Sequence, residues 1–276
     1  LDAVILSGNP GDGKTAFLVR LRELLIDQGA SIERDDGAGW LLQIDGRTFA
    51  AVYDASESYE GRSSDDLIIE ALEPYKSENA HTAVIAANDG RLLQFFNDFH
   101  REFPEIEAAV RAGLESQKST AKRVVFIDLK KRSLSNFDGS GFARDLAHLV
   151  TAQERWGDCL DCKAQPVCPI YANTVAFDDN MMNGIARLVV LSHLKRRRRA
   201  TMRDLRSALA WIITGDRSCE DVHEAAQDGL DLKRGTGTRI EDLVFSRESN
   251  DYLVQEWSDS DPARVISPGL ERRLRM

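Results

Sequence analysis

The chain is poor in cysteine, in basic charge and in long apolar runs, and each shortage narrows the class of protein. Only 4 of its 276 residues are cysteine, too few for a disulfide scaffold of this size. No apolar run approaches the roughly 18 residues that a membrane span needs, which excludes an integral membrane protein. The chain has 36 Lys and Arg against 45 Asp and Glu, which gives a net charge of -9. This charge argues against a generally basic nucleic-acid-binding surface but allows local basic patches.

The remaining composition is typical of a folded globular protein. With 42% hydrophobic and 29% charged residues the chain can bury a sizeable core, so disorder is excluded as its main state. A prior of about 150 residues per domain predicts one or two domains. The first apolar stretch leads straight into a glycine-rich loop, so we expect no signal peptide and a cytoplasmic protein. Because Leu1 stands at the foot of a core strand, we expect a domain excised from a longer chain.

Hydrophobic patterning divides the chain into an α/β part and a helical part. Buried strands are expected at 3–6, 82–87 and 123–127, with a β-hairpin at 41–53, and helices at 15–27, 63–72, 92–103 and 105–114. Beyond Asp128 the pattern predicts only helices, at 142–155, 183–195, 202–213 and 219–227. The expected fold class is α/β, a parallel sheet core with helices on both faces at 1–135, followed by a helical lid region at 136–276.

The segment between the first strand and the first helix has the pattern G-x-x-x-x-G-K-[ST], in the context that this pattern requires. Glycines let backbone N–H groups surround a phosphate chain, and the helix that begins there directs its positive dipole end at the same anion. Lys14 is expected to reach the β- and γ-phosphates and Thr15 to ligate Mg²⁺. The sequence therefore predicts a P-loop NTPase core that binds ATP with Mg²⁺. The predicted binding residues are Gly8, Asn9, Pro10, Gly11, Asp12, Gly13, Lys14, Thr15 and Ala16.

A P-loop nucleotidase also needs a carboxylate at the end of a neighbouring strand to hold Mg²⁺. Asp54 follows the hairpin strand and Asp128 ends the third buried strand. From the residue pattern alone, either of them could be this Mg²⁺ acid. Glu57 is a candidate base for the attacking water. Asn88 follows the second buried strand, where an amide either orients the reactants or caps the next helix.

Several motifs together resemble bacterial AAA+-like ATPases of anti-phage defence and restriction loci, in particular the ATPase component of DNA-phosphorothioation-dependent restriction systems. The resemblance spans nearly the whole chain. It lies in the motifs at 8–15, 54–57, 86–92 and 126–129, the Cys-x-x-Cys…Cys-Pro run, and the segments 201–205 and 261–263.

The resemblance implies an ATP-hydrolysing switch or motor that works with partner proteins on DNA. In that family the Mg²⁺ acid precedes the sensor amide, an order that makes Asp54 the acid, Glu57 the base and Asn88 the sensor. It further implies a second sensor in the helical region, a position that Arg203 matches. Rings of the family also supply an arginine finger to a neighbouring subunit, which implies a homo-oligomer and makes Arg101 and Arg111 candidates.

The few cysteines are concentrated in the helical region. Cys159, Cys162 and Cys168 lie within ten residues, and three soft ligands so close together favour a structural Zn²⁺ site, which needs four. Cys219 is the leading fourth ligand and His223 the reserve. An iron–sulfur cluster would suit the same thiolates and stays an alternative.

The run Lys195–Arg199 consists of five consecutive cations and could contact DNA phosphates, although such runs are more often solvated helix ends. The sequence thus predicts an ATPase, a switch or motor in a DNA-linked bacterial defence process. One alternative is a nucleotide-gated assembly module with little turnover. The other is a P-loop kinase for a small molecule, with Asp128 as its Mg²⁺ acid.

Overall fold

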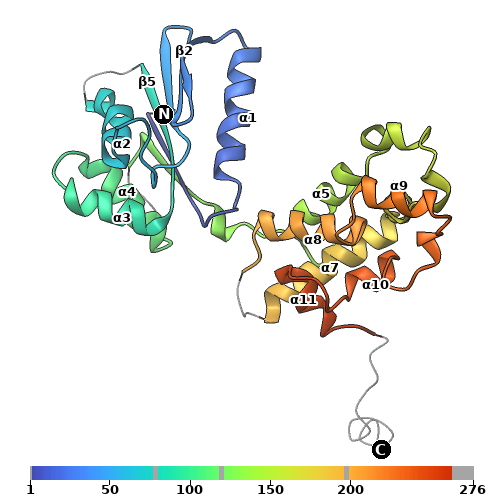
Figure 1. Ribbon diagram of the computed structural model, residues 1–276. Coiled ribbons are helices and arrows are strands. Elements are labelled where there is room, and N and C mark those ends of the chain that lie inside the picture. The colour runs from blue at the N-terminus through green and yellow to red at the C-terminus, as the bar shows by residue number, and fades with distance from the viewer. Residues whose placement is uncertain (1, 77–79, 118–120, 196–198, 263–276) are drawn as a thin grey trace, which may run out of the picture. The chain divides into compact units, whose positions relative to one another are not determined.

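The computed structural model describes residues 2–76, 80–117, 121–195 and 199–262. The chain divides into two compact units between Arg132 and Ser133 (Figure 1). This division lies three residues before the expected end of the first domain at residue 135. Each unit is described by itself.

The first unit is built on a six-stranded sheet with the order β2-β3-β4-β5-β1-β6. Strands β4, β5, β1 and β6 pair in parallel, whereas β2, β3 and β4 pair antiparallel. The sheet is therefore mixed: the expected parallel core is present, and an antiparallel edge of β2, β3 and β4 extends it. The strand bounds are β1 Ala3–Ser7, β2 Ser31–Asp36, β3 Gly39–Ile44, β4 Arg47–Val52, β5 His81–Ala87 and β6 Val124–Asp128.

The antiparallel edge has a local cause. Asp45 and Gly46, with φ angles of 50° and 72°, form the tight turn that joins β3 to β4, as the hairpin prediction required. Strand β2 extends this hairpin by one strand that the sequence did not predict. Its residues are mostly charged and exposed, which is common in an edge strand but gives no apolar alternation to recognise.

Helices cover both faces of the sheet (Figure 1). Consecutive residues of β1 alternate between the two faces, since Ile5 packs with the core of α2, α3 and α4 while Leu6 packs with Leu18 and Leu25 of α1. The helix bounds are α1 Lys14–Asp27, α2 Ser64–Leu72, α3 Asp89–Asp98 and α4 Pro104–Leu114.

The second unit is helical in its described part, as expected. Helix α8 lies at its centre, with Leu205, Leu209 and Ile212 buried in one core with Leu253 and Trp257 of α11. Short helices α6, α10 and α11 were not predicted, because they span too few turns to show a clear period. The bounds are α5 Phe142–Thr151, α6 Pro169–Val175, α7 Asp179–Lys195, α8 Met202–Thr214, α9 Cys219–Gln227, α10 Ile240–Val244 and α11 Tyr252–Ser258.

The start of α8 depends on a capping box. The Thr201 hydroxyl accepts the N–H of Asp204, and the Asp204 carboxylate accepts the N–H of Thr201 at 2.8 Å. We expect Thr201→Ala to lower the free energy of unfolding by about 1 kcal/mol, measured by urea denaturation, because the N–H of Asp204 loses its acceptor. Thr201→Ser keeps the hydroxyl and is the matched control. A Thr201→Ala protein as stable as wild type would show that the cap contributes nothing.

Candidate functional site

The predicted phosphate loop connects β1 directly to α1. Gly11 and Gly13 have φ angles of 91° and 94°, a backbone conformation that favours glycine. The Asp12 carboxylate accepts the N–H of Asn9 at 2.7 Å and so closes the loop on itself. The turn is thus formed by Gly13, a fixed position of the sequence pattern, together with Gly11 and Asp12 at variable positions.

Lys14 is buried in this loop, as Gly8 and Asp12 are. Its ammonium donates to the carbonyls of Gly8, at 2.8 Å, and Asn9, at 3.1 Å, which holds it over the loop. Burial lowers the pKa of Lys14, an effect that the nearby carboxylates of Asp54, Asp12 and Asp89 partly offset. A buried cation beside three carboxylates is suited to an anionic ligand that brings a divalent cation with it.

The predicted acids, Asp54 and Asp128, and the predicted amide, Asn88, lie where the parallel strands end, on the side of the sheet from which this loop extends. Strands β4, β5, β1 and β6 are parallel, so their carboxyl ends lie together on that side. Asp54 follows β4, Asn88 follows β5, and Asp128 ends β6 in register with Ser7 of β1. Ligands of open α/β sheets bind at the carboxyl ends of the strands.

Asp54 and Asp128 differ in their surroundings. Asp54 is exposed, and its carboxylate accepts the N–H of Ser56 at 2.9 Å. The Asp128 side chain is only 8% exposed and lies 3.8 Å and 3.7 Å from the ammonium groups of Lys130 and Lys131. A buried carboxylate with two ammonium groups within 4 Å is a poorer ligand for a further cation than an exposed one, which makes Asp54 the better candidate for the Mg²⁺ acid.

Asn88 is a helix cap, and it also makes a second contact. Its side-chain oxygen accepts the N–H of Arg91 at 2.8 Å and so caps α3. Its amide nitrogen donates to the hydroxyl of Ser56 at 3.0 Å, which ties it to the segment that carries Asp54. Glu57, the predicted base, is exposed in the same segment.

Asp89, which the sequence pattern did not predict as a site residue, lies beside Asn88, just beyond the end of β5. Its carboxylate accepts hydrogen bonds from the Ser7 hydroxyl and from the Lys130 ammonium. Burial alone would raise the pKa of Asp89, but these hydrogen bonds and the charges of Lys130 and Lys131 lower it. The sequence feature that could have identified Asp89 as a site residue is its position directly after Asn88, at the end of a buried strand.

The predicted metal ligands of the second unit surround one cavity of about 20 Å³, which all four cysteines and His223 line. The sulfur of Cys162 lies 3.3 Å from Nε2 of His223, and the sulfur of Cys168 accepts the N–H of Tyr171 at 3.4 Å. Burial raises the pKa of the Cys159 thiol, and the other three cysteines raise it further. Within the described ranges, however, no three or more His, Cys, Asp or Glu side chains are placed so that they could hold a metal ion.

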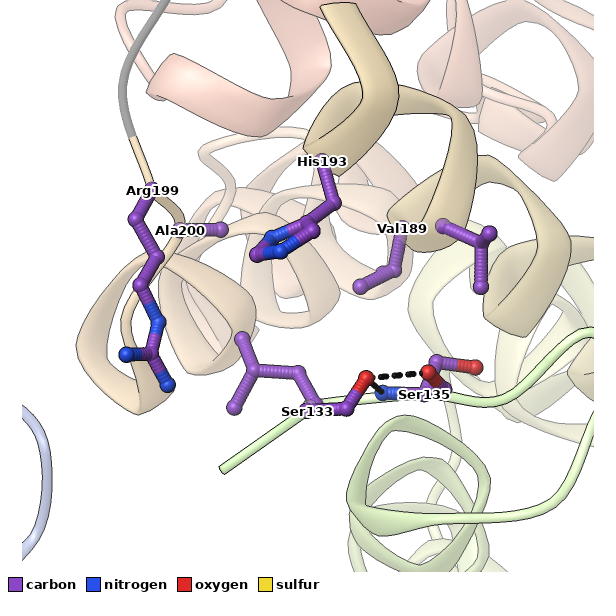
Figure 2. Close-up of a pocket in the computed structure, with 8 residues that line it drawn as sticks. Ser133, Ser135, Val189, His193, Arg199 and Ala200 are labelled. Atoms are coloured by element: carbon purple, nitrogen blue, oxygen red, sulfur yellow. Dashed lines mark hydrogen bonds between the residues drawn. The ribbon is translucent and has the colours of Figure 1, made fainter. Parts of the chain in front are cut away.

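The basic run is only partly described. Lys195 donates to the carbonyl of Glu256 at 3.1 Å and to the hydroxyl of Ser260 at 3.0 Å, while residues 196–198 lie outside the described residues. Arg199 lines a small cavity with Ser133 and His193 (Figure 2). DNA contact through Lys195–Arg199 therefore stays a prediction.

The predicted arginines lie at exposed positions, two of them on helices and one in a turn. Arg203 is exposed in the first turn of α8. Arg111 of α4 pairs with Glu107 at 2.8 Å, and Arg101 lies in the turn between α3 and α4. Their roles as second sensor and arginine finger stay predictions.

Comparison of the chain with protein-family models, with curated proteins and with solved structures finds no match. The resemblance to defence ATPases therefore stays a prediction from motifs. No helix in the described part of the chain has the length and apolar character that crossing a bilayer requires.

Proposed function

We propose that the chain binds ATP with Mg²⁺ at residues 8–16 and hydrolyses it. The observation that carries this proposal is the phosphate loop itself, with the Lys14 ammonium held over two loop carbonyls among three carboxylates. The test is release of free phosphate from ATP in the presence of Mg²⁺. We expect release by the wild type and none by Lys14→Ala.

Lys14 exchanges its bonds to Gly8 and Asn9 for oxygens of the β- and γ-phosphates when nucleotide binds. The hydroxyl of Thr15 and the carboxylate of Asp54 are hard oxygen ligands, which fit Mg²⁺. The metal, when bound, neutralises charge on the phosphates. Glu57 accepts a proton from the attacking water, whose oxygen bonds to the γ-phosphorus as the bond to ADP breaks.

Asn88 is proposed to orient this water or the γ-phosphate, in addition to capping α3. Asn88→Asp keeps an oxygen for the cap but removes the amide donor, so we expect normal thermal stability and a hydrolysis rate at least about 10-fold lower. Asn88→Ala should lower both, stability by about 1 kcal/mol. If Asn88→Asp hydrolyses ATP at the wild-type rate, the residue is a cap and nothing more.

The proposed output is that of a switch or motor in a DNA-linked bacterial defence or restriction process in the cytoplasm. Protein partners or further copies of the chain take part, and DNA is a possible partner through Lys195–Arg199. In this picture the second unit is the lid, and Arg203 senses loss of the γ-phosphate. The proposed zinc has no step in the reaction and stabilises the second unit.

A nucleotide-gated assembly module is the second candidate. The exposed side chain of Glu57, three residues beyond Asp54, favours it, because a base that is not held in place gives slow turnover. The kinase alternative is less well supported, since the acid that it requires, Asp128, has a buried side chain with two lysine ammonium groups within 4 Å.

A further inference from the structure

The cysteine cluster lies in a segment with very little apolar packing. From residue 152 to 168 the chain forms turns and two short 3-10 helices, at Gln153–Cys159 and Gln165–Val167. All of this segment is described, and Ala164 is its one buried residue. A segment that buries so little needs another source of stability, as small domains with weak cores do.

Donor side chains enter the cluster from separate elements. Cys159 and Cys162 come from the loop itself, Cys168 stands directly before α6, and Cys219 begins α9. His223 lies four residues after Cys219, on the same face of α9. The cavity that they line, about 20 Å³, has room for one water-sized particle, and hence for one metal ion.

We propose that this cluster binds one Zn²⁺ through the thiolates of Cys159, Cys162, Cys168 and Cys219. Coordination places each sulfur about 2.3 Å from the metal. No three of the described donors are so placed without the metal, so the proposal requires the cysteine side chains to change χ1 rotamer as the metal binds. His223 is the outer partner, since its Nε2 lies 3.3 Å from the Cys162 sulfur and can donate to it once that sulfur is a thiolate. The metal thereby ties the 152–168 segment to α6 and α9, independently of the phosphate loop.

The test is the zinc content of the full chain purified without chelator, measured by mass spectrometry against protein concentration. We expect one zinc per chain in the wild type and a loss of zinc in each of the four Cys→Ser variants. Gln165→Ala removes a side chain that lines the same cavity but is no ligand, and it should keep the metal. His223→Gln should keep the stoichiometry and lower the zinc affinity about 10–100-fold.

A second measurement covers the case in which the Cys→Ser variants fail to fold. Wild-type protein reconstituted with Co²⁺ should show the visible bands of a tetrahedral site and thiolate charge-transfer absorption. Bound iron with inorganic sulfide, or a wild-type chain without metal whose melting temperature ignores chelator, would overturn the zinc proposal. Loss of zinc in His223→Gln but not in Cys219→Ser would overturn the proposed ligand set.

Discussion

Replacing Lys14 with alanine is expected to weaken ATP·Mg²⁺ binding about 10²–10⁴-fold, because at least two charge-assisted hydrogen bonds of roughly 1.5–3 kcal/mol each are lost. In the structure the ammonium already lies within the loop, on the carbonyls of Gly8 and Asn9, so little rearrangement separates it from a bound phosphate. Isothermal titration calorimetry with ATP and excess Mg²⁺ measures the effect.

The matched control is Lys122→Ala, which removes an equal charge from the same unit. Lys122 is exposed and directly precedes Arg123 and β6, at the amino end of the parallel strands and opposite to the loop, so this variant should bind ATP within about 3-fold of wild type. A melting temperature for each variant separates lost binding from lost folding. ATP affinity that is unchanged in folded Lys14→Ala would contradict the proposed site.

Asp54→Ala is expected to lower the rate of ATP hydrolysis by about 100-fold or more, because it removes the carboxylate proposed to hold Mg²⁺ against the phosphates. Asp128→Ala should change the rate by less than about 10-fold, since that carboxylate already pairs with Lys130 and Lys131. Steady-state phosphate release at saturating ATP, with Mg²⁺ varied, compares the two variants.

Asp54→Asn is the conservative variant at the same position and separates the effect of charge from that of side-chain size. It keeps the side-chain size and an oxygen that can accept the N–H of Ser56, so a fall in rate there is due to the lost charge. The opposite pattern, an inactive Asp128→Ala beside an active Asp54→Ala, would assign the metal to the end of β6. It would also restore the kinase alternative.

The sequence predicts those parts of the fold in which local pattern and tertiary packing agree. The phosphate loop is an example, because strand, glycines and helix are contiguous and each has its own signal. Strand β2 is the opposite case. It pairs with β3 through the backbone ladder and through the Asp36 carboxylate, which accepts the N–H of Gly39, and side-chain patterning does not report such pairing.

In the candidate sites, too, the sequence predicts what is local and not what tertiary packing brings together. The close spacing of Cys159, Cys162 and Cys168 is visible in the sequence, whereas the approach of α9 with Cys219 and His223 depends on packing around a shared core. Asp89 was missed for a related reason. Its contact with Ser7 and Lys130 follows from the pairing of β1 with both β5 and β6, which only the sheet topology defines.

Single-turnover hydrolysis with enzyme in excess over radiolabelled ATP, with Mg²⁺ and with or without duplex DNA, tests the central claim most directly. It separates an ATPase from a gated module, because it detects cleavage even when product release is slow. We predict that bound ATP is converted to ADP and free phosphate, and that Lys14→Ala and Asp54→Ala abolish the conversion. ATP that stays bound and intact in the wild type, or that does not bind, would contradict the proposed function.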